Sequence, residues 1–141
     1  ELREAAWQAL DLPGCFADIA PAYWSSFHAG VPQPPVPTLL HALLGLDGAG
    51  AREDWMRAAN YLEIGWNAAL LPPDQLGPAC EIFALAVERE EPVIVATLAE
   101  RYLLPWIERA QQQIDASAPV LGELLDRFHA YVKRAPTHGR A

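Results

Sequence analysis

Apolar residues recur every three or four positions along most of this chain, and no long segment alternates apolar with polar residues. Helical spacing gathers such residues on one face, whereas strict alternation is the pattern of a half-buried strand. One stripe follows a proline suited to a first helical turn, and it consists of Val95, Leu98, Tyr102, Trp106 and Ala110. The spacing therefore predicts an all-α fold, a compact bundle of about five to seven helices.

Several prolines are predicted to lie between helices or to interrupt them. The chain has 13 of them, and a proline lacks a backbone N–H and disfavours helical backbone in the residue before it. Segment 30–37, GVPQPPVP, is therefore predicted to be an extended crossing loop, although such a run can also be a polyproline ligand. Segment 70–78 is predicted to be hinge-like, and Pro105 to lie at a kink or helix boundary.

Three helices carry expectations that can be checked residue by residue. The string DGAGA at 47–51 is predicted to be a turn or loop, so that the next helix has Glu53 and Asp54 in its first turn. Its apolar stripe is Trp55, Ala59, Leu62 and Trp66. The following helix is predicted to bury Leu76, Cys80, Phe83, Ala84 and Val87. The last helix is predicted to follow a Ser117 cap.

Length and charge limit the class of protein. A chain of 141 residues that is 52% hydrophobic is predicted to form one domain, 1–141. Its net charge of −8 disfavours nucleic acid as a partner and favours cationic partners, although an acidic surface also simply keeps a protein soluble. No apolar run approaches the roughly 18–20 residues that cross a bilayer, so no stable membrane insertion is predicted.

The residues that usually carry chemistry are scattered. Cys15 and Cys80 form neither a disulfide framework nor a zinc pattern, and they are predicted to be buried free thiols in a reducing compartment. The four histidines have no metal-ligand spacing: His28, His41, His129 and His138. No metal, no cofactor and no catalytic activity is therefore predicted. A small helical enzyme that uses Cys80, Asp74 or a histidine is the rival hypothesis.

Asp74 stands out because it follows two prolines at the start of a predicted helix. Its ordinary role would be to cap that helix. Pro78 cannot donate the first intrahelical hydrogen bond if Asp74 is the cap. A helix that starts later would free the carboxylate to face a groove.

Two motifs and a proline-rich stretch resemble a known family. LPPDQLGPACEIFAL at 71–85 resembles the E-P-D-H-L-G segment of the TorD/DmsD/NarJ family, the cytoplasmic maturation chaperones of molybdenum oxidoreductases. The matching residues are Pro73, Asp74, Leu76, Gly77 and Glu81. ERYLLPWIERA at 100–110 resembles the family's H-L-x-P-W segment through Leu103, Pro105 and Trp106. With YWSSFHAGVPQPPVP at 23–37, the resemblance covers about residues 20–130 in order.

The chain also departs from the family pattern. Gln75 and Tyr102 stand where the family has histidines, and Pro72 replaces the usual glutamate. A glutamine cannot titrate near neutral pH, which argues against a pH-gated role at that position. The chain lacks an initiator Met and is shorter than the family leads us to expect, so part of the N-terminal region is predicted to be missing.

The resemblance implies a TorD-like cytoplasmic chaperone. Such a protein binds the twin-arginine signal peptide, the body, or both, of a client molybdenum oxidoreductase and assists cofactor insertion before export. The peptide-binding residues that the resemblance implies are Asp74, Gln75, Leu76, Glu81, Tyr102 and Trp106. If Asp74 accepts a hydrogen bond from a peptide arginine, Asp74→Ala should weaken binding and leave the fold nearly intact.

The same sequence is compatible with a homodimer. It is also compatible with an alternative function, a helical adaptor or scaffold subunit of a redox enzyme complex without signal-peptide binding. An exposed apolar face without a groove would favour the adaptor.

Overall fold

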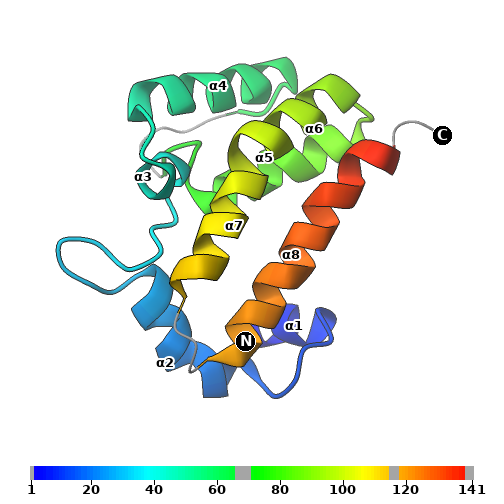
Figure 1. Ribbon diagram of the computed structural model, residues 1–141. Helices are drawn as coiled ribbons and strands as arrows, with labels where there is room; N and C mark the ends of the chain where they lie inside the picture. The colour runs from blue at the N-terminus through cyan, green and yellow to red at the C-terminus, as the bar shows by residue number, and fades with distance from the viewer. Residues whose placement is uncertain (1, 66–70, 115–117, 139–141) are drawn as a thin grey trace.

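The computed structural model describes residues 2–65, 71–114 and 118–138, and within these ranges the regular structure is helical (Figure 1). The elements are α1 (Leu2–Ala9), α2 (Phe16–Phe27), α3 (Leu40–Leu44), α4 (Gly48–Tyr61), α5 (Leu76–Glu88), α6 (Pro92–Leu98), a π-helical turn η1 (Ala99–Leu103), α7 (Leu104–Gln113) and α8 (Pro119–His138). Since α6, η1 and α7 follow one another without a break, the described chain contains seven separate helices. The predicted all-α bundle is confirmed.

The long helices pack around one apolar core. α7 and α8 run antiparallel and side by side, α1 and α2 lie near the start of α8, and α4 lies at the opposite end beside α5 and α6 (Figure 1). The largest fully buried apolar side chains include Trp55 of α4, Phe83 of α5 and Trp106 of α7. Burial of an aromatic side chain supplies a large share of core free energy. Among the described residues, no helix is both long enough and apolar enough to cross a membrane.

The segment Pro92–Gln113 carries the predicted buried stripe, and a π turn explains its spacing. All five stripe residues are buried, from Val95 to Ala110. Steps of four residues in a straight α-helix rotate by about 40° each, so three such steps from Leu98 would drift off one face. The π turn holds an extra residue and offsets this drift. Pro105 lies in the first turn of α7, directly after the π turn, so the predicted boundary is a change from π- to α-helix and not a break between helices.

The prediction for the start of α4 is wrong. The helix already begins at Gly48, and DGAGA belongs to it instead of forming a turn. Asp47 is the N-cap, and its carboxylate accepts from the backbone N–H groups of Ala49 at 3.4 Å and Gly50 at 3.1 Å. This capping compensates for the low helix propensity of the glycines. Glu53 and Asp54 consequently lie in the second turn.

The predicted buried face of α5 is partly wrong. Phe83 is buried as expected, but the other buried residues of this helix are Ala79, Ile82 and Ala86. Ala84 is exposed, and the three other predicted positions are half-buried: Leu76, Cys80 and Val87. The stripe of α4 is confirmed at Trp55, Ala59 and Leu62. Trp66 and the predicted Ser117 cap lie outside the described residues.

The proline-rich crossing loop leads to a short backbone clamp. Residues 30–37 contain no helix, as predicted. Just after them, the N–H of Leu40 donates to the carbonyl of Asp74 at 3.0 Å, and the N–H of Leu76 donates to the carbonyl of Thr38 at 2.9 Å. These two bonds form an isolated antiparallel bridge between Leu39 and Gln75. The clamp therefore fixes the start of α3 against the start of α5.

Candidate functional site

Asp74 is a fully buried carboxylate that joins three parts of the chain. One of its oxygens is hydrogen-bonded to Nδ1 of His41 in α3, and the other accepts from Nε of Arg52 in α4 at 3.4 Å. Gln75, not Asp74, occupies the N-cap position of α5. The helix does start later than an Asp74 cap would require. The carboxylate nevertheless faces its own chain, because a buried charge needs a partner.

The other residues implied by the family resemblance lie in different surroundings. Trp106 is fully buried, and its indole N–H donates to the carbonyl of Pro37 at 3.0 Å. Gln75 donates from Nε2 to Oγ1 of Thr38 at 2.5 Å. Leu76 is half-buried and Glu81 is exposed. These residues do not form one open peptide-binding surface together with the buried Asp74.

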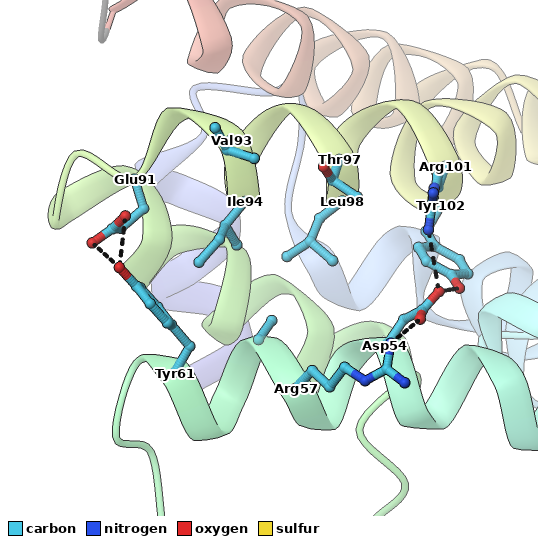
Figure 2. A pocket seen from close by; sticks show the side chains of 11 residues that line it. Asp54, Arg57, Tyr61, Glu91, Val93, Ile94, Thr97, Leu98, Arg101 and Tyr102 are labelled. Carbon is cyan, nitrogen blue, oxygen red and sulfur yellow. Dashed lines mark hydrogen bonds and ion pairs between the residues drawn. The ribbon is translucent and has the colours of Figure 1, made fainter.

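Tyr102 is the exception, because it lies at one end of a groove between α4 and the α6–η1 segment (Figure 2). The groove has a volume of about 550 Å³. Its lining residues are Asp54, Arg57, Ala58, Tyr61, Glu91, Val93, Ile94, Thr97, Leu98, Arg101 and Tyr102. The floor and rim are mainly apolar, and Val93 and Tyr61 are 77% and 63% exposed. Such a concave apolar surface with a few polar groups is the usual form of a binding site.

One end of the groove is a polar cluster around Asp54. Its carboxylate accepts from the hydroxyl of Tyr102 at 2.5 Å and pairs with the guanidinium groups of Arg101 at 3.7 Å and Arg57 at 3.9 Å (Figure 2). Arg57 also pairs with Glu53 at 2.5 Å. Burial, followed by the hydrogen bond to Asp54, raises the pKa of Tyr102 well above its usual range. Tyr102 therefore stays a neutral donor at physiological pH.

The other end of the groove is marked by Glu91, the residue just before α6. The hydroxyl of Tyr61 donates weakly to the Glu91 carboxylate, at 3.4 and 3.5 Å from its two oxygens (Figure 2). No ion pair between Glu91 and a cationic side chain occurs within the described residues. This carboxylate can therefore accept a cation from outside.

In the described residues, the cysteines and the other metal-ligating residue types do not gather in groups of three or more. Both thiols are free and half-buried. Burial, and secondly the charge of Glu81, raises the pKa of Cys80 to about 12, which keeps it protonated and poorly nucleophilic. Over the part of the chain that the structure describes, no three His, Cys, Asp or Glu side chains gather as a metal site would require.

A second hollow, with a volume of about 340 Å³, is smaller than the groove and is lined by Val87, Tyr131, Arg134 and Ala135.

The sequence predicted a groove at Asp74, not this groove between α4 and α6, although α4 contains a signal for it. Asp54, Arg57 and Tyr61 are spaced by three and four residues, so they share a face of α4 next to the buried Trp55 stripe. An aromatic residue on a polar helix face is a hint of a binding surface. The other wall of the groove, the α6–η1 segment, cannot be predicted from the sequence, because it depends on how α6 packs against α4.

In comparisons with known proteins, no family model, no curated protein and no solved structure matches this chain. The family resemblance therefore rests on the motifs given above.

Proposed function

We propose that this protein is a maturation chaperone of the TorD type, which binds the twin-arginine signal peptide of a client molybdenum oxidoreductase in the cytoplasm. The proposal places the peptide in the groove between α4 and α6, and it treats the protein as a binding protein instead of an enzyme. The single observation that carries it is the groove itself, an apolar groove with the Glu91 carboxylate, which has no cationic partner among the described residues, at one end, in an acidic chain.

The chemistry of the groove suits a signal peptide. A twin-arginine signal combines guanidinium groups with an apolar segment, so it needs both carboxylate acceptors and apolar surface. The exposed faces of Tyr61 and Val93 lose unfavourable contact with water when an apolar segment covers them. The net charge of −8 also speeds the encounter with a basic peptide.

The buried family-motif residues receive a different role on this proposal. Asp74 and Trp106 hold the helices together from inside, through His41, Arg52 and the Pro37 carbonyl. Asp74 positions α4, the wall of the groove that carries Asp54 and Tyr61, Trp106 holds the crossing loop that leads to α3, and neither residue contacts the peptide. The motif would then preserve the shape of the site instead of its contacts.

Titration calorimetry with a twin-arginine peptide, and with a Lys-Lys version as control, tests this proposal. The Lys-Lys peptide should bind more weakly, because lysine cannot make the paired hydrogen bonds of a guanidinium. Val93→Asn removes apolar contact from the groove rim and should weaken binding about threefold to tenfold. Val31→Asn is the matched control: Val31 is 98% exposed, does not line the groove, and its replacement should leave affinity unchanged.

The outcomes separate the two candidate functions. Co-purification of a molybdenum oxidoreductase, together with peptide binding that Val93→Asn weakens, supports the chaperone. Stable co-purification without any binding of the signal peptide favours the adaptor subunit instead. Equal affinities of wild type and Val93→Asn would remove the peptide from this groove.

A further inference from the structure

We propose that the groove holds its peptide in one orientation, with a basic side chain at Glu91 and apolar side chains along the floor toward Tyr102. This inference rests on the proposed function, because it requires that the groove binds a peptide with basic and apolar residues. It goes further by making Glu91 the residue that recognises the cation. The reason is that the two ends of the groove differ in charge.

The Asp54 end cannot readily accept another cation. Its carboxylate already has a hydroxyl donor in Tyr102 and two guanidinium partners in Arg57 and Arg101. A peptide arginine placed there would meet both resident guanidinium groups, and like charges at close range repel. This end therefore disfavours the basic part of a peptide.

The Glu91 end has the opposite character. Its carboxylate has only the weak donor Tyr61 among the described residues. Residues 88–91 contain three acids, Glu88, Glu90 and Glu91, and one base, Arg89, which donates to the carbonyl of Leu62 and keeps its positive charge. A cation at this end would meet an excess of negative charge. Charge complementarity thus selects Glu91 as the acceptor.

The length of the floor limits the peptide. Asp54 and Tyr61 are seven residues apart on α4, which is roughly 10 Å along a helix axis. An extended peptide covers this distance with about three residues and a helical one with about seven. The apolar side chains should therefore lie within two helical turns of the arginine, over Ile94 and Leu98.

Glu91→Gln tests the inference against a matched control. It removes one charge and keeps the size of the side chain, and Glu91 makes no side-chain cap to α6, so the fold should persist. Because the carboxylate is half-exposed, we expect affinity for the twin-arginine peptide to fall about threefold to tenfold. Glu123→Gln removes the same charge from an exposed residue of α8 that does not line the groove, and affinity should stay within about twofold of wild type.

Photo-cross-linking determines the orientation directly. A photoreactive residue at the basic end of the peptide should label the region of Tyr61 and Glu91, and one at the apolar end should label the region of Leu98 and Tyr102. Undiminished binding by Glu91→Gln, with both probes labelling both ends, overturns the orientation and leaves the proposed function standing. No binding by wild type overturns both. A wild-type dimer that Val93→Asn dissociates would assign the groove to a second copy of the chain and also overturn the inference.

Discussion

Asp74→Ala should destabilise this protein through the loss of a buried carboxylate, and the size of the effect follows from its partners. His41, whose side chain is 19% exposed, loses a charged acceptor worth about 1.5–3 kcal/mol. Arg52 is 48% exposed and lies at 3.4 Å, so solvent screening leaves that pair at most about 1 kcal/mol. We therefore expect the free energy of unfolding to fall by about 1.5–4 kcal/mol.

Urea denaturation followed by circular dichroism measures this change. Asp47→Ala is the comparison, because Asp47 is a true helix cap at the surface and its loss should cost about 1 kcal/mol. Asp74→Asn keeps the shape and should lie between wild type and Asp74→Ala. Since the expected loss is smaller than the usual stability of a domain, Asp74→Ala should stay folded and keep its affinity for the peptide.

Two results would refute the reasoning about Asp74. The first is an unfolding free energy of Asp74→Ala within about 0.5 kcal/mol of wild type, which would mean that the carboxylate is not buried and paired. The second is a folded, stable Asp74→Ala that has lost peptide affinity. That result would place the carboxylate in direct contact with the peptide, as the family resemblance implies.

The remaining predictions concern alkaline pH and the indole hydrogen bond. Folding raises the pKa of Cys80 from 9.0 to about 12 and raises that of Tyr102, so the unfolded chain releases these protons first as pH increases. The contribution of these two groups to the free energy of unfolding is therefore complete below about pH 9 and declines above it. Urea titrations at pH 8, 9 and 10 should show a falling free energy of unfolding. The fall should be smaller in Cys80→Ala. Trp106→Phe leaves the buried Pro37 carbonyl without its donor and should lower the free energy of unfolding by about 2–4 kcal/mol. Trp24→Phe is the control, because the Trp24 side chain is 42% exposed, and it should cost less than about 1 kcal/mol. Equal losses of stability in the two variants would contradict the hydrogen bond.

The sequence was sufficient to predict the helices whose apolar spacing is local. The buried stripe from Val95 to Ala110 follows from residues within one segment, and so does the boundary at Pro105. The start of α4 was missed because a single capping carboxylate, Asp47, outweighs the low propensity of two glycines. The face of α5 was shifted because its buried residues are decided by the packing of α5 against α6 and α4, which the spacing within α5 does not show.

The candidate site was much harder to predict, because its contacts join distant segments. Asp74 meets His41 and Arg52 from 33 and 22 residues away, and no local pattern reveals that these side chains converge. Tyr102 was selected for its position in a motif. Its actual surroundings depend on Asp54, which lies 48 residues earlier. In the sequence nothing distinguishes Glu91 from the other acidic residues, because its place in the groove depends on the packing of α6 beside α4.

The clamp between residues 38–40 and 74–76 makes the exposure of Asp74 and the shape of the groove a single event. α3 and α4 lie within the chain segment that the clamp closes, whereas α6 lies outside it. A local opening that breaks the clamp and separates Asp74 from His41 and Arg52 therefore frees the carboxylate and, at the same time, releases α4, one wall of the groove. The amide protons of Leu40 and Leu76 donate the two hydrogen bonds of the clamp, so their exchange with solvent reports how often this happens. Peptide bound between α4 and α6 ties the two walls together and should slow the exchange of both amides.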